Sequence, residues 1–225
     1  MKEQKYILIL APVLLSLVAI LSYLKITNVK NDTEKFINEY EKLNNTNYKI
    51  DTKNIKNVKY SSYDEVFNII KSDTAIIYLG YPDDDNSRYL VDTLFKTIIE
   101  NSIETTVYYL DIHGDRDEYT IENDKLVYEK DENGKELKGT DNYFKLMGML
   151  DEYLGEYVLY LDDKEYSTNE KRIPLPSVIF IKDGKILGIE YASIDIPLED
   201  LNLNIENYLL NMYSTSCDVG KENPC

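Results

Sequence analysis

The chain has little of the chemistry on which most redox, metal and nucleic-acid-binding proteins depend. Its 225 residues include one histidine, two cysteines and no tryptophan. Both cysteines, Cys217 and Cys225, lie at the extreme C-terminus, so the body of the chain carries no thiol. Basic side chains are also few, since 25 lysines and arginines stand against 41 acidic residues and give a net charge of -16. A chain of this charge is repelled by nucleic acid and by anionic lipid headgroups.

One long hydrophobic run stands at the N-terminus. Residues Tyr6 to Leu24 are uncharged and consist mostly of leucine, isoleucine and valine. In a helix with a rise of about 1.5 Å per residue, this run can cross a hydrocarbon core of about 30 Å. Lys2 and Lys5 precede it and no pair of small residues marks its end, so we expect an uncleaved signal anchor over residues 1–30, with a cleaved signal peptide as the alternative. The protein would then be a single-pass protein of the cell membrane, with its acidic domain on the extracytoplasmic side.

The two cysteines have two interpretations. In the oxidising environment outside the membrane, Cys217 and Cys225 would form a disulfide that closes a small loop and adds little stability. The alternative is a thiol–disulfide oxidoreductase that uses this pair. A C-terminal tail offers no helix N-terminus that would lower a thiol pKa, so we prefer the first.

Composition divides the rest of the chain into three parts. Residues 31–57 are polar and are expected to form a juxtamembrane spacer. Residues 58–213 combine apolar strands with amphipathic helices and hold enough apolar side chains for one sizeable core. Within this domain, the charged stretch 113–140 is predicted to be an exposed insertion with a hairpin at Asn133-Gly134. Residues 214–225 form the tail.

The hydrophobic patterns predict the order β-α-β-α-β, then the insertion, then α-β-β-α. Ala75 to Leu79 is a continuous apolar run, which is typical of a buried strand. Ser177 to Ile181 and Ile186 to Tyr191 flank the tight turn 182–185 and predict a closing hairpin. Strands that alternate with helices favour parallel pairing, to which the hairpin adds antiparallel strands. We therefore expect an α/β fold with a central mixed sheet flanked by helices.

The loop after Leu79 has the composition of a ligand-binding or capping segment. It reads Gly80-Tyr81-Pro82-Asp83-Asp84-Asp85-Asn86-Ser87-Arg88 and leads into a helix. The simplest role for its carboxylates is to accept amide N–H groups at the helix start, from Asp84 or Asp85. Asp83, Asp84 and Asp85 are also oxygen ligands suited to Ca²⁺. Neighbouring residues in one loop rarely converge on an ion, so we favour capping.

Two further residues carry weaker signals. His113, the sole histidine, follows a predicted strand and is interpreted as a loop residue, because no nucleophile is identifiable beside it. Arg116 stands between two aspartates and is expected to be a solvent-exposed ion-pair partner.

The order of elements and two local motifs together resemble the thioredoxin fold. The loop is similar to the Tyr-x-Gly-x-Pro-x-Cys-Pro-x-Cys-Arg stretch of membrane-anchored, extracytoplasmic thioredoxin-like proteins of Gram-positive bacteria, a group that includes bacteriocin-transport accessory proteins. The residues at matching positions are Tyr78, Gly80, Pro82 and Arg88. Leu175-Pro176-Ser177 looks like the cis-proline strand of the family. The resemblance covers about residues 58–212.

The same resemblance places oxygen where the family has sulfur. Asp84-Asp85-Asn86-Ser87 replaces the Cys-x-x-Cys motif, with Asp84 and Ser87 at the cysteine positions. Dithiol exchange needs one thiolate to attack a disulfide and a second thiol to resolve the mixed disulfide, so this loop is expected to be redox-inactive. No cofactor is implied.

What the resemblance implies instead is a peptide-binding groove. In the family the cis proline helps to dock an extended chain beside the site, although turn geometry alone is a simpler reason to keep Pro176. The partner would be an extended segment of an envelope or secreted protein. The residues expected to form the groove are Tyr81, Pro82, Asp84, Asp85, Ser87 and Pro176.

Overall fold

The computed structural model describes residues 22, 24, 26–42, 48–161, 164–193 and 197–213. Most of the predicted anchor lies outside these residues, as does the tail with Cys217 and Cys225. No helix in the described part of the chain is both long and apolar enough to cross a membrane.

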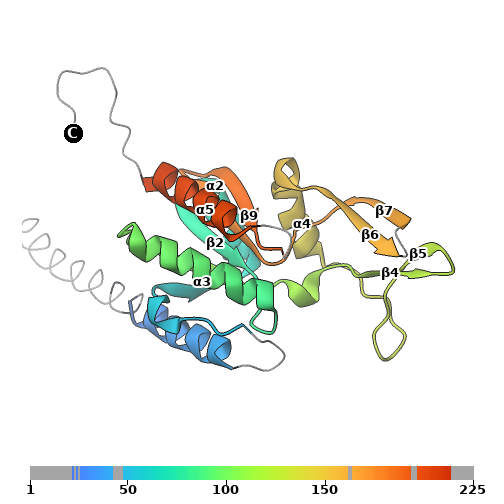
Figure 1. Cartoon of the computed structure of the whole chain (residues 1–225), viewed down its shortest axis with the longest axis horizontal. Helices are drawn as coiled ribbons and strands as arrows, with labels where there is room; N and C mark the ends of the chain where they lie inside the picture. The colour runs from blue at the N-terminus through green and yellow to red at the C-terminus, as the bar shows by residue number, and fades with distance from the viewer. Residues whose placement is uncertain are drawn as a thin grey trace, which may run out of the picture.

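A mixed sheet of five strands forms the centre of the molecule (Figure 1). Its first three strands run parallel, and the last two form an antiparallel hairpin whose first strand pairs with the central strand. The prediction of an α/β fold with a mixed sheet flanked by helices is confirmed. In spatial order the strands are β1 (Val58–Tyr60), β3 (Val107–Leu110), β2 (Ala75–Leu79), β8 (Ser177–Lys182) and β9 (Lys185–Tyr191).

Two hydrophobic cores cover the two faces of the sheet, because successive residues of a strand point to opposite faces. In β2 every residue is buried, with Ile76 and Tyr78 in one core and Ile77 and Leu79 in the other. The helices that pack on the first face are a helix over residues 26–41, α3 (Asp85–Glu100) and α5 (Leu198–Tyr213). Those on the second face are α2 (Tyr63–Ser72) and α4 (Asp141–Met149).

The segment predicted as a spacer is an integral part of the domain. In the helix over residues 26–41, Phe36 and Tyr40 are fully buried and stack with ring centroids 4.3 Å apart. Ile50 and Ile55 enter the same core on either side of the short helix η1 (Thr52–Asn54). The spacer prediction is therefore wrong for these residues. The spacing of Phe36 and Tyr40 places both on one face of a helix. The many Asn and Lys residues around them gave no indication that this face packs on the sheet.

Two hairpins extend from the domain on one side of the sheet (Figure 1). The first follows η2 (His113–Asp115) and reverses at Asn123 and Asp124, which both have positive φ. Asn133-Gly134 forms only a smaller turn, closed by an isolated bridge between Lys130 and Glu136. The second hairpin follows η3 (Asp151–Tyr153). The acidic composition of residues 155–172 predicts a loop there, and that prediction is wrong, because the stretch forms two paired strands. The strands are β4 (Tyr119–Glu122), β5 (Lys125–Tyr128), β6 (Glu156–Leu161) and β7 (Lys164–Lys171).

The predicted closing hairpin depends on a glycine that approaches another backbone. Asp183 and Gly184 have φ angles of 50° and 71°, a left-handed region that glycine adopts freely and aspartate tolerates. A Cβ atom on Gly184 would lie 2.4 Å from the carbonyl oxygen of Lys71, near the end of α2. Gly184 also donates its N–H to the carbonyl of Asp73 at 2.9 Å. The turn therefore packs against the end of α2 with no space for a side chain.

We expect Gly184→Ala to destabilise the fold more than an equivalent change elsewhere. The positive φ alone costs about 1–2 kcal/mol, and displacing the end of α2 should add roughly 1–3 kcal/mol. Gly134→Ala is the matched control, because Gly134 also has positive φ (79°) but a Cβ there meets open space. Urea denaturation of both variants measures the difference. Equal losses would show that the contact with α2 imposes no constraint.

Candidate functional site

The carboxylates of the loop between β2 and α3 hold the loop itself. Asp84 is the N-cap of α3, and its Oδ2 accepts the N–H of Ser87 at 2.6 Å. Asp85 Oδ1 accepts the backbone N–H of Tyr48 at 3.0 Å. The capping interpretation is therefore confirmed for Asp84. Among the described residues, no group of three or more His, Cys, Asp or Glu side chains is arranged to hold a metal ion.

Arg88 ties this loop to the helix over residues 26–41. Its side chain is fully buried. It donates from Nε to the carbonyl of Pro82 at 2.7 Å, from Nη1 to the carbonyl of Tyr40 at 2.6 Å, and from Nη2 to the carbonyl of Lys42. The last carbonyls of a helix lack partners within the helix and attract a cation. Arg88 thus caps one helix while it fixes the start of the next.

Tyr78 lies beneath the loop and restricts it from below. Its Oη makes a hydrogen bond of 2.8 Å with Tyr40 Oη and donates to the carbonyl of Ser87 at 3.3 Å. Burial raises the pKa of Tyr78, so its hydroxyl stays neutral at any physiological pH. A Cβ on Gly80 would lie 2.2 Å from Tyr78 Oη. A glycine is required at position 80 by this close approach.

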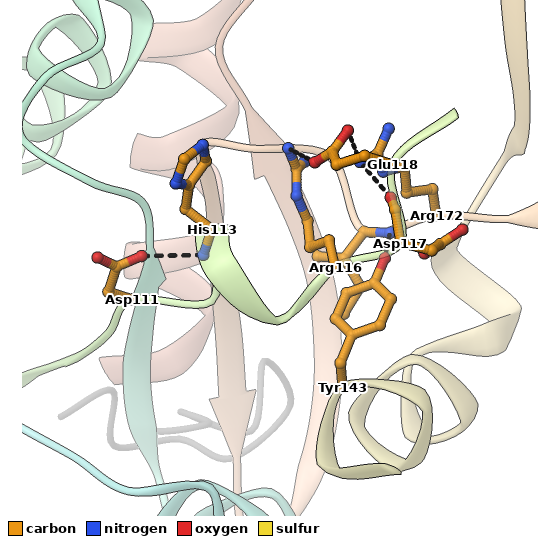
Figure 2. A network of polar contacts seen from close by, with 8 residues as sticks. Asp111, His113, Arg116, Asp117, Glu118, Tyr143 and Arg172 are labelled. Carbon is orange, nitrogen blue, oxygen red and sulfur yellow. Dashed lines mark hydrogen bonds and ion pairs between the residues drawn. The ribbon is translucent and has the colours of Figure 1, made fainter. Parts of the chain in front are cut away.

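On one side of the loop lies a cavity of about 610 Å³, which we call the histidine-side cavity. Tyr81, Pro82 and Asp83 line it together with His113. The rings of Tyr81 and His113 stack with centroids 4.1 Å apart, and the backbone N–H of His113 donates to Asp111 Oδ1 at 2.9 Å (Figure 2). His113 therefore lies beside the loop as a stacking partner.

A second cavity, of about 420 Å³, borders the first turn of α3 and the segment before β8; we call it the proline-side cavity. Asn86 lines it from α3, and Pro174 and Leu175 line it just before the cis peptide bond to Pro176. β8 then begins at Ser177, opposite Leu79 at the end of β2. Tyr81 and Pro82, predicted to share a groove with Pro176, line the other cavity.

Two arginines line the proline-side cavity and meet on one carboxylate. Arg116 Nη2 lies 3.1 Å from Glu118 Oε1, and Arg172 Nη2 lies 2.7 Å from Glu118 Oε2 (Figure 2). The side chains of Arg116 and Arg172 are only 14% and 10% exposed. The prediction that Arg116 is an ion-pair partner is therefore confirmed, but its predicted exposure to solvent is wrong. We call these three residues the arginine cluster.

The arginine cluster joins both hairpins to the domain. Arg172 Nη2 also donates to the carbonyl of Asp117 at 2.7 Å, and its guanidinium lies 4.1 Å from the ring centroid of Tyr157 in β6. Burial opposes the charge of Arg172, but the hydrogen bond and ion pair with Glu118 outweigh it and raise the pKa of the guanidinium. Burial raises the pKa of Asp117, which is 4% exposed. Arg172 therefore stays charged in a largely enclosed position.

One feature of the sequence could have identified these arginines. The chain has 22 lysines but only three arginines, at positions 88, 116 and 172. Lysine does not reproduce the planar set of donors of a guanidinium, so rare arginines in a lysine-rich chain mark places where that geometry is needed. All three prove to be buried or nearly buried at the loop and its neighbouring cavity.

Comparison with known proteins adds no assignment. No protein-family model matches the chain, and no curated protein is a significant match to it. Function must therefore be argued from the two cavities, the capped loop and the arginine cluster.

Proposed function

We propose that this chain is a redox-inactive, thioredoxin-like binding module. Residues 1–30 would anchor it in the cell membrane, and the acidic domain outside would hold an extended segment of an envelope or secreted protein. The strand order β1-β3-β2-β8-β9, with an antiparallel closing hairpin, supports the thioredoxin-like part of this proposal. So does the position of Pro176, directly before the strand that pairs with β2.

The proposal rests on the proline-side cavity, which lies beside the first turn of α3. The side chains at the start of this helix carry oxygen atoms and no sulfur. By the resemblance, dithiol exchange would need cysteines at positions 84 and 87. At these positions Asp84 caps α3 and Ser87 is buried. The cavity itself has the lining of a recognition site, with aromatic side chains around a few polar groups. The cavity also has three tyrosines, Tyr153, Tyr157 and Tyr191. Tyrosine offers a large contact area and loses little conformational entropy when a ligand binds. Such a cavity can bind a peptide segment without performing chemistry on it.

A pair of glycines allows a matched test of binding in this cavity. Gly155 lines the proline-side cavity, and Gly148 lies in α4 away from it. A Cβ on either glycine meets open space, so both accept a side chain without a clash. We expect the full chain to retain peptides from a random decapeptide library, and Gly155→Trp to weaken their binding by about tenfold or more because the indole fills the site. Gly148→Trp should bind as the parent does.

Two measurements complete the test. Affinity selection with mass spectrometry identifies the retained peptides, and fluorescence anisotropy gives their dissociation constants. Insulin reduction by the same protein, with Cys217→Ser and Cys225→Ser in place, should show no turnover. Peptides that bind Gly155→Trp as tightly as the parent would place the binding site elsewhere, and turnover without the tail cysteines would contradict the redox-inactive part.

A further inference from the structure

The proline-side cavity is bordered by two of the three arginines of a chain with net charge -16. Their only acidic ion-pair partner within the cluster is Glu118, which contacts each guanidinium through a single nitrogen, Nη2. Two guanidinium groups therefore share one carboxylate. Glu156 also lines this cavity and the buried Asp117 interacts with Arg172, so the surplus at this site is one of guanidinium hydrogen-bond donors and not of net positive charge.

Several guanidinium donors remain without an acceptor. In the described part of the chain, Nε of Arg116 and Nε of Arg172 are enclosed and have no hydrogen-bond partner. A buried donor left unpaired is unfavourable, and more so when it belongs to a charged group, so each such group calls for an explanation. Nη2 makes all the hydrogen bonds of both guanidiniums to described residues, with Glu118 and, from Arg172, with the carbonyl of Asp117. The arginine cluster thus has more donor capacity than its own acceptors use.

We propose that the arginine cluster recognises a carboxylate carried by the segment bound in the proline-side cavity. This inference rests on the proposed function and specifies the ligand class of the same site. A guanidinium pairs with a carboxylate through two parallel N–H···O bonds, a geometry that neither lysine nor a neutral donor offers. The carboxylate belongs either to the C-terminus of the segment or to an aspartate or glutamate side chain within it.

The overall charge of the chain makes this preference unusual and therefore testable. Long-range attraction to a protein of charge -16 favours basic peptides. A preference for acidic peptides can arise only from a local site that outweighs this field. Arg116 and Arg172 line the proline-side cavity and, with Nε donors that have no acceptor among the described residues, offer such a site.

The test uses two decapeptide libraries, one ending in a free carboxylate and one in an amide, with the full chain. Each selected peptide is then compared with versions in which the C-terminus is amidated or each acidic side chain is changed to its amide. Neutralising the recognised carboxylate should weaken binding about tenfold to a hundredfold, and the position that matters identifies its source. Arg172→Lys should reduce affinity for the carboxylate form about tenfold more than it reduces affinity for the neutral form. Lys171→Gln is the control, because it removes an adjacent positive charge that pairs with Asp151 outside the cavity.

A second variant separates recognition from structural support. Glu118→Gln keeps the shape of the side chain but removes the carboxylate that competes for the arginines. We expect it to bind carboxylate peptides several-fold more tightly, whereas a purely structural cluster predicts equal weakening for acidic and neutral peptides. Equal weakening for acidic and neutral peptides would overturn the inference. So would peptides whose binding is weakened by Gly155→Trp but does not depend on a carboxylate; either result would leave the proposed function standing. An absence of any peptide sensitive to Gly155→Trp would overturn both.

Discussion

Arg88→Leu should lower the free energy of unfolding by about 3–6 kcal/mol, since each buried carbonyl left without a donor costs about 1–3 kcal/mol. The side chain is fully buried, and its acceptors belong to Tyr40, Lys42 and Pro82, with Tyr48 at 3.4 Å. Leucine fills much of the space but donates to none of these carbonyls. Proteins of this size are typically stable by about 5–15 kcal/mol, so this single change should bring the fold close to its limit.

A graded series distinguishes the hydrogen bonds of Arg88 from its volume and charge. Arg88→Lys keeps the charge but presents one ammonium group to carbonyls that lie in different directions, so it should recover only part of the loss. Lys96→Leu is the control on the same helix, because its side chain is 60% exposed and pairs with the equally exposed Glu100. Urea denaturation followed by far-ultraviolet circular dichroism is suitable, since the chain has no tryptophan. A loss below 1 kcal/mol for Arg88→Leu would contradict the role described for this residue.

Local patterns predicted the central part of the fold because they report directly on burial. The continuous apolar run of β2 and the Asp183-Gly184 turn are read correctly within a few residues, since burial and positive φ act on neighbouring positions. The hairpin of β6 and β7 was missed. β7 reads Lys-Glu-Tyr-Ser-Thr-Asn-Glu-Lys, and only Tyr166 in it is buried, so no apolar alternation marks it as a strand.

The sequence predicted the interactions of the candidate site between neighbouring residues. It did not predict the interactions between residues far apart in the chain. Capping by Asp84 follows from the residues next to it in the sequence. The arginine cluster joins Arg116 and Glu118 to Arg172 across more than fifty positions, and the charged neighbours of Arg116 suggested a solvated ion pair. Burial of Phe36 and Tyr40 was hidden for the same reason, since a polar segment can still pack one apolar face on a distant sheet. A local pattern can show that a helix has an apolar face, but it does not show which distant element that face packs against.

If the proposed thioredoxin-like correspondence holds, cysteines at positions 84 and 87 should give the loop dithiol-exchange activity. In a background with Cys217→Ser and Cys225→Ser, we expect the double variant Asp84→Cys, Ser87→Cys to reduce insulin disulfides with measurable turnover when dithiothreitol returns its oxidised pair to the dithiol. The amide of Ser87 now donates to the Asp84 carboxylate at 2.6 Å, at the positive end of the dipole of α3. The same amide would stabilise a thiolate at position 84 and lower its pKa, while the thiol at position 87 would resolve the mixed disulfide.

Two controls make this gain of activity informative about the fold. Asp84→Cys alone should form a mixed disulfide with substrate but should not turn over, because the resolving thiol is missing. Loss of the Asp84 cap should cost about 0.5–2 kcal/mol, so thermal unfolding shows whether the variant remains folded. If the folded double variant forms no bond between its two new thiols on oxidation, positions 84 and 87 do not correspond to a dithiol motif. If it forms that bond and reduces insulin, the chain lacks only sulfur at a site otherwise built for disulfide exchange, which supports descent of a binding module from a redox scaffold.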